Sequence, residues 1–399
     1  LGAACTHPRT KATGPMTTPD TSARFAAVDA RIERDLAEGH YPGAILAVSI
    51  DGRVVHQRQW GAYANEARAS NPVTGDTRVM LYSFSKMVSA TVVMSVVEEG
   101  KLELDAPLRD VLPGFEGHGK ERITLRHVLT HSAGIPGHGP DDSPMRIERD
   151  DWSRYFKHLC TLEPEWPAGS RTLYHGVTGM FLAGLAATTA TGKDFETLCR
   201  ERLLDPIGAS SLSFVPPADR EGLALTPLPK QHPASIDEGA YRAWRWHPAG
   251  AMMGRPADML RVLQVHLNGG AWEGRQLLKP ATIAEMHRVQ YQAERDAARA
   301  RGEAPVHETW GLGILMRADA PGGWFGLAEG LSPRAFGHAG ISTLVGNADP
   351  ARGLAYAFAA TGEGPGSEQT TATRNDIANL LAQAVKARAW AQARASIHR

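Results

Sequence analysis

Apolar residues near the start of the chain recur at intervals of three and four. In residues 25–36 they are separated by Asp, Glu and Arg, which is the spacing of an amphipathic helix that Gly39 ends. Residues 44–60 form two runs, AILAVSI and RVVHQRQWG, around the dipeptide Asp-Gly. These runs predict an antiparallel hairpin with a tight turn. The chain is therefore expected to open with a helix and two paired strands.

The middle of the chain has helical rather than strand patterns. Apolar positions continue from residue 80 to Gly100 and predict a long helix with this glycine at its C-terminal end. Residues 105–300 are typical of helical stretches divided by Pro and Gly. Strand patterns return in WGLGILM, RAFGHAG, STLVGNADP and GLAYAFAAT, before a final helix from about Thr371. An α+β fold with one antiparallel sheet, built from both ends of the chain, is predicted.

The same pattern predicts the division into domains. Residues 1–20 are small and polar and are expected to form a flexible tail. Residues 21–80 and 300–399 are expected to build an α/β domain around the antiparallel sheet, with the terminal helices flanking it. Residues 81–299 are expected to form a mainly α-helical domain. No repeat and no βαβ alternation occurs, which disfavours a doubly wound parallel sheet.

Charge and hydropathy exclude several partners. The 43 Lys and Arg residues balance 43 Asp and Glu residues, so no basic field exists to attract nucleic acid or an anionic membrane. The longest apolar helical stretch, residues 87–97, is too short to span a bilayer, and no membrane span is expected. The compartment stays open. The cytoplasm is favoured, and export remains an alternative because GAAC near the start is similar to the end of a lipoprotein signal.

Cysteine and histidine spacing does not indicate a metal site. Cys5, Cys160 and Cys199 are an odd number without metal-type spacing, so neither a disulfide framework nor a zinc site is predicted. His127 and His131 stand four apart in HVLTH, but the glutamate of a His-Glu-x-x-His metalloprotease is missing. These histidines are expected to be structural, and neither a metal nor another cofactor is expected.

Residues 83–86 read SFSK at the start of the long apolar helix. Residues three apart share a helix face, so Ser83 and Lys86 can come within hydrogen-bonding distance, whereas Ser85 points elsewhere. A serine becomes nucleophilic when a base takes its proton, and burial lowers the pKa of a lysine toward that role. The alternative is a helix start with a capping serine and a solvated lysine, because Ser-x-x-Lys often arises by chance. These four residues alone leave both alternatives open.

The surrounding segments favour the chemical alternative. Serine β-lactamases, penicillin-binding proteins and family VIII carboxylesterases carry Ser-x-x-Lys at the start of such a helix. KLELDAPLRDVLPGF and ITLRHVLTHSAGIPG are similar to the segments after the nucleophile helix of class C β-lactamase-like proteins. PAGSRTLYHGVTGMF is similar to their tyrosine-motif region, and FGHAGISTLVGNADP to their third-motif strand. Over roughly residues 21–385, the chain resembles this superfamily, and most of all the class C β-lactamase-like family VIII carboxylesterases.

The resemblance implies a β-lactamase/transpeptidase-like fold with the active site between the sheet domain and the helical domain. It implies that Ser83 is the nucleophile, Lys86 its proton acceptor, and Tyr174 a second acid or base. Lys86 is expected to favour the phenolate of Tyr174, so that the two groups titrate as a coupled pair. The backbone N–H groups of Ser83 and Ile341 would form an oxyanion hole, and Gly340 would keep the strand accessible to substrate.

Two departures from the family pattern concern the substrate. His338, Ala339 and Gly340 replace Lys-Thr-Gly, and Gly176 replaces the Asn of many β-lactamases. Each charge-assisted hydrogen bond is worth about 1.5–3 kcal/mol. His338 is still expected to contact substrate, but anionic substrates should bind less well than neutral esters.

The sequence therefore favours a serine hydrolase that acts on a small-molecule carboxylic ester through a Ser83 acyl-enzyme. An acyltransferase could use the same intermediate, whereas a β-lactamase or D-alanyl-D-alanine peptidase is disfavoured by His338 and Ala339. A catalytically silent ligand-binding homologue is the alternative from another class. Trp244 and Trp246 are candidates for an acyl pocket, or else for core packing. The missing Gly-x-Ser-x-Gly excludes an α/β-hydrolase elbow, and the oligomeric state stays open.

Overall fold

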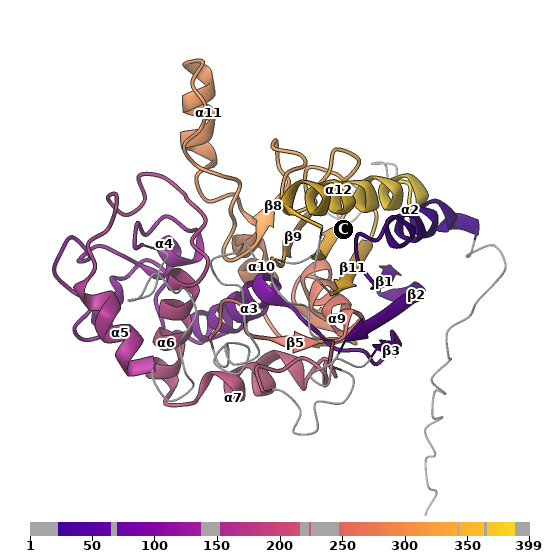
Figure 1. Cartoon of the computed structure of the whole chain (residues 1–399). Helices are drawn as coiled ribbons and strands as arrows, with labels where there is room; N and C mark the ends of the chain where they lie inside the picture. The colour runs from indigo at the N-terminus through magenta and orange to yellow at the C-terminus, as the bar shows by residue number, and fades with distance from the viewer. Residues whose placement is uncertain are drawn as a thin grey trace, which may run out of the picture.

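A seven-stranded antiparallel sheet lies toward one side of the computed structural model, with the strand order β3-β2-β1-β11-β10-β9-β8 (Figure 1). Its strands are β1 (Gly43–Ile50), β2 (Arg53–Ala64), β3 (Ser70–Pro72), β8 (Leu315–Met316), β9 (Phe336–Ala339), β10 (Leu344–Asp349) and β11 (Leu354–Thr361). Because β1 pairs with β11 along its whole length, the two ends of the chain meet in the middle of the sheet. The structure describes residues 23–64, 70–136, 152–215, 223–224, 247–341, 343–362 and 365–387.

The turn between β1 and β2 shows why the first hairpin forms. Asp51 and Gly52 have positive φ angles of 52° and 77°, as both central residues of a type I′ turn require. This turn matches the twist of the strands that it joins. The hairpin predicted from the Asp-Gly dipeptide is confirmed.

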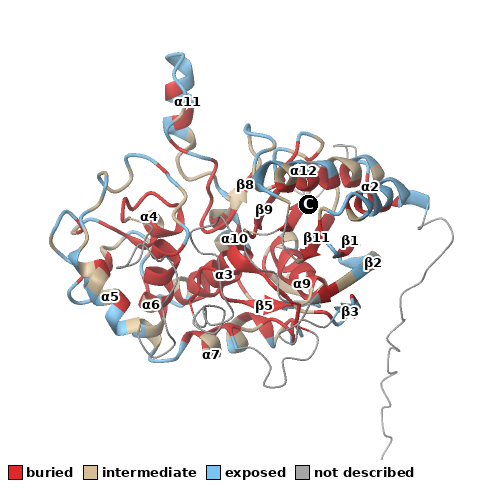
Figure 2. Cartoon of the chain, in the orientation of Figure 1, coloured by how far each residue is buried: buried red, intermediate tan, exposed pale blue. Residues whose placement is uncertain are grey.

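Side chains of β1 alternate between two hydrophobic cores, because successive residues of a strand point to opposite faces. Ala44, Leu46 and Val48 pack in the core with α2 (Ala26–Ala37) and α12 (Ser367–Ala384). Ile45 and Ala47 belong to the second core, which includes α9 (Pro256–Leu267). Figure 1 shows α2 and α12 on one side of the sheet and α9 on the other. Both faces of β1 are thereby shielded from water, whereas much of the neighbouring strand β2 is exposed (Figure 2).

The helix α3 (Ser85–Glu98) runs through the centre of the molecule and is buried along most of its length (Figure 2). Its sequence is apolar on nearly all sides, as expected of a helix surrounded by protein. Gly100 follows it with a φ of 73° and donates its N–H to the carbonyl of Val97 at 2.9 Å, which confirms the predicted glycine stop. The helix α3 is therefore a rigid support for the residues at its N-terminal end.

The remaining elements complete the helical part. Figure 1 shows α4 to α7 together on the side away from the sheet, and α11 projecting from the body. Among the described residues, no helix has the length and apolar character needed to cross a bilayer. The bounds are η1 (Tyr82–Phe84), η2 (Leu108–Asp110), α4 (Leu125–Leu129), α5 (Trp152–Thr161), α6 (Thr178–Thr191), α7 (Phe195–Cys199), η3 (Arg200–Leu204), α10 (Pro280–His287) and α11 (Gln292–Ala300), with the short strand pairs β4 (Val79–Met80) with β5 (Met253–Gly254) and β6 (Ala271–Trp272) with β7 (Arg275–Gln276).

The predicted α+β class, with one antiparallel sheet flanked by the terminal helices, is confirmed. The domain limits stay a prediction. The helix α9 packs against β1, β10 and β11, although its sequence falls within residues 81–299. The expected tail, residues 1–20, lies outside the described residues. The last helix begins at Ser367, earlier than expected, because its first turn is polar and gives no apolar signal.

Candidate active site

Ser83 and Lys86 lie on one continuous helical path at the centre of the molecule. Ser83 is in the 3-10 turn η1, which leads directly into α3, where Lys86 is the second residue. The Lys86 Nζ atom is 3.0 Å from Ser83 Oγ and 2.8 Å from the carbonyl oxygen of Ala249. Lys86 is only 1% exposed. The alternative of a solvated lysine at a helix start is therefore wrong.

Burial gives Lys86 the properties of a base. It lowers the pKa of the Lys86 amine to about 7, because a charged ammonium loses its hydration in the interior. The neutral amine has two hydrogens and one lone pair. One hydrogen can be donated to the carbonyl of Ala249, and the lone pair can then accept the Ser83 hydroxyl proton. The Ala249 carbonyl thus holds the amine in place while leaving it able to take a proton.

Tyr174 approaches the same serine from the segment before α6. Its hydroxyl donates a hydrogen bond of 2.7 Å to Ser83 Oγ, and Lys86 Nζ is 5.2 Å from the centre of its ring. We expected Lys86 to favour the phenolate. Burial instead raises the pKa of the Tyr174 phenol well above its usual range, so the phenol keeps its proton at neutral pH. This arrangement suits Tyr174 to donate a proton and Lys86 to accept one, and the catalytic roles of both residues stay a prediction.

Four rings surround Tyr174 and fix the plane of its phenol. Trp310 stacks on it at a centroid distance of 5.7 Å and an interplanar angle of 11°. His131 lies at 4.7 Å, Phe325 at 5.8 Å and His338 at 6.0 Å. Sequence reasoning missed Trp310 and Phe325, because both come from loops far along the chain that carry no motif. Packing against these four rings therefore restrains the orientation of the phenol.

His338, from β9, is fully buried beside this cluster. Its Nδ1 donates a hydrogen bond of 2.8 Å to the carbonyl of Ala339, because a carbonyl can only accept. Burial, and then the charge of Lys86, lowers the pKa of the His338 imidazole to about 3. His338 is therefore neutral at physiological pH. Its predicted contact with substrate stays a prediction.

Gly340 follows β9 and lies against the turn that carries Ser83. A Cβ atom at this position would be 3.0 Å from the carbonyl oxygen of Leu81 and 3.0 Å from Cβ of Tyr82, so a larger residue would push η1 away. The Arg374 guanidinium donates to the Gly340 carbonyl. In a trans peptide the C=O and N–H bonds point in opposite directions, so this contact orients the N–H of Ile341. The role of that N–H in an oxyanion hole stays a prediction.

The stretch WRWHPAG contributes through its backbone. Lys86 contacts the Ala249 carbonyl, and Ser89 Oγ donates to the Pro248 carbonyl at 2.7 Å. The candidates predicted from the sequence in this stretch are Trp244 and Trp246. Both tryptophans lie outside the described residues, and their place in an acyl pocket stays a prediction. Carbonyl contacts carry no side-chain signal, which explains why sequence reasoning missed them.

Ser85 has a different role from Ser83, as the helical spacing predicted. It is fully buried, and its Oγ accepts a hydrogen bond of 3.2 Å from the backbone N–H of Met252. Ser85 therefore ties α3 to the segment after Ala249, away from the Lys86 amine. Ser83 is the serine of the motif that contacts both Lys86 and Tyr174.

Comparison with known proteins places this chain in a family. The family model described as Beta-lactamase matches residues 28–380. The chain belongs to the beta-lactamase family. The members of this family are serine hydrolases with the β-lactamase/transpeptidase-like fold, and the resemblance inferred from the sequence is confirmed.

Three proteins that are similar to this chain have different names. Esterase/beta-lactamase LipL of Mycobacterium tuberculosis is 25% identical over 368 residues, which cover 84% of this chain and 80% of LipL. A penicillin-binding protein homolog from Caulobacter crescentus has a TM-score of 0.75 at 27% identity and covers 94% of this chain and 100% of its own. A family VIII carboxylesterase has a TM-score of 0.70 at 24% identity, with coverages of 92% and 98%, and shows the fold alone.

The two histidines of HVLTH make separate contacts within the protein. His127 Nδ1 accepts a hydrogen bond of 3.2 Å from the backbone N–H of Thr124, whereas His131 packs on Tyr174. Within the described ranges, a cluster with metal-ligand spacing consists of Asp35, Glu38 and His40. The Asp35 oxygens already accept hydrogen bonds from four neighbours, Arg31, His40, Tyr41 and Thr373. We assign no metal to this cluster.

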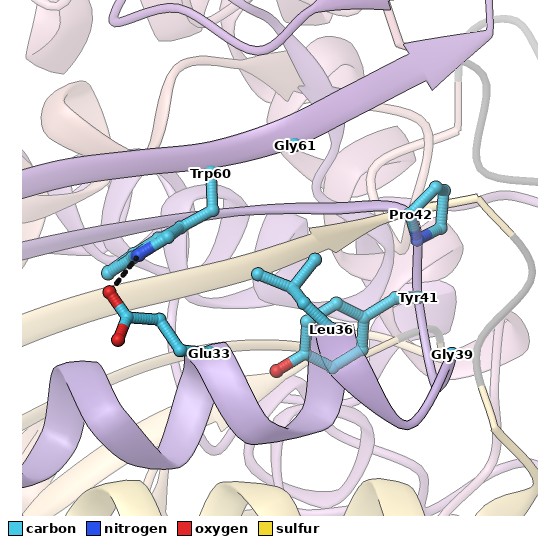
Figure 3. Close-up of a pocket in the computed structure, with 7 residues that line it drawn as sticks. All are labelled: Glu33, Leu36, Gly39, Tyr41, Pro42, Trp60 and Gly61. Atoms are coloured by element: carbon cyan, nitrogen blue, oxygen red, sulfur yellow. Dashed lines mark hydrogen bonds between the residues drawn. The ribbon is translucent and has the colours of Figure 1, made fainter.

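A surface pocket of roughly 590 Å³ lies between α2 and the first hairpin (Figure 3). In Figure 3, the indole of Trp60 points toward Glu33, and its Nε1 donates a hydrogen bond of 3.3 Å to the Glu33 carboxylate. None of the predicted site residues lines the pocket. We assign it no role. Its lining residues are Glu33, Leu36, Gly39, Tyr41, Pro42, Trp60 and Gly61.

Four buried histidines, His131, His247, His266 and His338, should make this protein sensitive to acid. Burial lowers the pKa of each imidazole, to about 3 for His247 and His338. In the unfolded chain each histidine takes up a proton near pH 6.5. The unfolded state then binds more protons, so the free energy of unfolding should decrease as pH falls below about 6.5. Each group contributes about 1.4 kcal/mol per pH unit.

Urea unfolding between pH 7 and pH 5 measures this effect. His266 donates to Thr91 Oγ1 at 2.8 Å, since that hydroxyl itself donates to the Met87 carbonyl. His266→Gln can keep this donor without titrating, and should lower the proton uptake on unfolding by about one. His118→Gln, at an exposed position, is the control for replacing a histidine that is not buried. Equal slopes for wild type and His266→Gln would contradict this explanation.

Proposed function

We propose that this chain is a serine esterase, which cleaves a neutral carboxylic ester through an acyl-enzyme at Ser83. One observation carries the proposal: Ser83 Oγ lies 3.0 Å from a buried amine and 2.7 Å from a half-buried phenol. A nucleophile, a base and an acid are therefore within reach of one reacting atom. Membership of the beta-lactamase family and the similarity to LipL, whose name includes esterase, support the same chemistry.

Acylation would begin with transfer of the Ser83 hydroxyl proton to the neutral Lys86 amine. The freed Oγ attacks the ester carbonyl carbon, a C–O bond forms, and the carbonyl oxygen becomes an oxyanion. The oxyanion would be stabilised by the backbone N–H groups of Ser83 and Ile341. The bond to the alcohol then breaks. Its oxygen takes a proton from Tyr174, which recovers one from the Lys86 ammonium. The products of this half-reaction are the free alcohol and the Ser83 ester.

Deacylation would reverse these roles with water as the nucleophile. Water loses a proton toward Lys86 and attacks the acyl carbon, after which Ser83 Oγ leaves and regains its proton. The acid product departs. Since one amine accepts the proton in both half-reactions, the rate of each should depend on the neutral form of Lys86.

The neutral state of His338 favours uncharged substrates. At the position where penicillin-recognising relatives have a fixed lysine cation, this chain has a buried imidazole whose pKa is lowered to about 3. An uncharged ring lacks the charge that holds a carboxylate, and a charge-assisted hydrogen bond is worth about 1.5–3 kcal/mol. Neutral acyl esters should therefore react faster than β-lactams or peptides that end in a carboxylate.

Trapping the acyl-enzyme tests the proposal. We expect purified protein to hydrolyse short-chain p-nitrophenyl esters, and a fluorophosphonate probe to add one adduct mass per chain, mapped to the peptide that contains Ser83. Ser83→Ala should lose the adduct, whereas Ser85→Ala should keep it. An adduct that persists in Ser83→Ala would remove this serine from the mechanism.

Two further outcomes separate the alternatives. A competing alcohol or amine that captures most of the acyl group, in place of water, would identify an acyltransferase. No adduct with ester, thioester, β-lactam and fluorophosphonate reagents would overturn the esterase proposal and favour a ligand-binding protein.

A further inference from the structure

His131 contacts the chain on both sides of Tyr174. The carbonyl oxygen of His131 accepts a hydrogen bond of 3.0 Å from the backbone N–H of Leu173. Its side-chain Nδ1 accepts one of 3.4 Å from the backbone N–H of His175. The residue before and the residue after the phenol are thus tied to the same histidine. The imidazole also packs on the Tyr174 ring and, at 4.5 Å, edge-on against Trp310.

The protonation of His131 is set by these contacts. A backbone N–H can only donate, so Nδ1 must carry the lone pair and the proton must be on Nε2. A protonated imidazole would lose this acceptor. It would also place a second cation near Lys86, whose charge lowers the pKa of His131 in addition to burial. The contact with His175 therefore requires the neutral ring.

The backbone at His131 is held in an unusual conformation. Its φ is 55°, in the left-handed region that non-glycine residues seldom adopt and that Asn, Asp and His tolerate best. Residues in this region persist where the surrounding structure holds them and occur often at functional sites. Neighbouring contacts supply that support: Ser132 donates its backbone N–H to the His127 carbonyl at 2.8 Å, and its carbonyl accepts from Gly169 at 2.9 Å.

We propose that His131 is a positioning residue for Tyr174, which sets where the phenol delivers its proton by holding the backbone on either side of it. The proposal rests on the proposed function, since it assumes that Tyr174 protonates the departing alcohol. His131 acts through Tyr174 rather than on the substrate. A displacement of about 1 Å at a reacting group can cost about 10²-fold in rate, so these backbone contacts have a catalytic consequence.

The dependence of rate on the leaving alcohol distinguishes this role from ordinary core packing. Loss of a proton donor harms esters of poorly leaving alkyl alcohols and spares p-nitrophenyl esters, whose leaving group departs as a stable anion. Core packing alone would lower both rates equally. The measured quantity is kcat/KM for one acyl group joined to alcohols of increasing pKa, because this ratio contains only the steps through acylation.

Tyr174→Phe provides the reference. We expect it to lower kcat/KM for alkyl esters by about 10²-fold or more, and to change p-nitrophenyl ester hydrolysis far less. If Tyr174→Phe gives no such difference, the proposed role of Tyr174 fails and the inference about His131 fails with it. If Tyr174→Phe gives it and the His131 variants do not, only the inference about His131 is overturned.

His131→Gly and His131→Asn form a matched pair, because both residues tolerate positive φ. Only asparagine offers an oxygen that can accept from the N–H of His175. We expect His131→Gly to shift the leaving-group dependence toward that of Tyr174→Phe, with about a tenfold loss on alkyl esters relative to aryl esters. His131→Asn should restore most of the wild-type dependence. The segment before Tyr174 has a second anchor that does not involve His131. The Thr172 N–H donates to the Val306 carbonyl, and the Thr172 hydroxyl accepts from the Glu308 N–H.

A double variant completes the test. If His131 acts only through Tyr174, adding His131→Gly to Tyr174→Phe should produce no further change in the leaving-group dependence. A further change there, or equal losses on aryl and alkyl esters in His131→Gly, would overturn the proposal. Thermal unfolding of each variant, together with the rescue by asparagine, separates a positional effect from a general loss of folded protein.

Discussion

Ser83→Ala should abolish ester hydrolysis, with kcat falling about 10⁴-fold or more. The hydroxyl of Ser83 contacts both the Lys86 amine and the Tyr174 phenol, and the proposed acyl-enzyme cannot form without it. The measurement is steady-state hydrolysis of a short-chain p-nitrophenyl ester, with intact-mass analysis to exclude contaminating wild-type protein.

Ser85→Ala is the matched control for this variant. Ser85 is buried two residues away and accepts from the N–H of Met252, so its loss should cost about 0.5–1.5 kcal/mol of stability. Its catalytic rate should stay within about tenfold of wild type, since the Ser85 hydroxyl contacts the backbone of Met252 rather than a proposed reacting atom. If Ser83→Ala keeps the wild-type rate, or if Ser85→Ala loses it, the assignment of Ser83 as the nucleophile is wrong.

Replacing Lys86 should have the next largest effect. We expect Lys86→Met, which is similar in length but has no basic nitrogen, to lower kcat about 10³-fold. In the wild type, burial lowers the pKa of the amine to about 7. The neutral base is populated above this value and lost below it, so kcat/KM should rise with pH through about 7 and then level off. Stopped-flow or steady-state assays between pH 5.5 and pH 9 measure both results.

Lys86→Arg separates a base from a fixed positive charge. An arginine keeps the cation and the donors but does not give up its proton in this pH range. If Lys86 acts as a base, Lys86→Arg should be as inactive as Lys86→Met. If the site needs only a positive charge, Lys86→Arg should retain substantial activity, and the pH dependence of the wild type would need another explanation. Adding Ser83→Ala to Lys86→Met should reduce the rate little further, because the two residues act as a unit.

The long strands could be predicted from local patterns because each carries its own signal, whereas β3 (Ser70–Pro72) was not predicted and the strand predicted over WGLGILM is reduced to Leu315–Met316. The Asp51-Gly52 turn fixes the first hairpin, and the nearly continuous apolar run along β1 suits a strand buried on both faces. The packing of α9 on the sheet was not predictable in the same way. Its apolar residues indicate a helix, but a helix with one apolar face can pack on either other helices or a sheet. Only the path of the whole chain decides between them.

In the candidate active site, too, some contacts could be predicted from local sequence and others could not. Ser83 and Lys86 are three apart, and their contact follows from helical geometry. Tyr174 lies 91 residues after Ser83, and the resemblance to known families, rather than spacing, connected the two. The Ala249 carbonyl, Trp310 and the His131 side chain had no motif to indicate their positions. Their contacts depend on loops that come together only in the folded molecule.

By itself, the sequence determined the α+β class, the paired strands at both ends of the chain and the serine and lysine on one helix face, because these depend on interactions between near neighbours. Only the tertiary structure decided the ionisation of the site. Burial lowers the pKa of Lys86 and raises that of Tyr174, which reverses the expected phenolate. Burial is a property of all the surrounding segments together, so no local stretch of sequence could specify it.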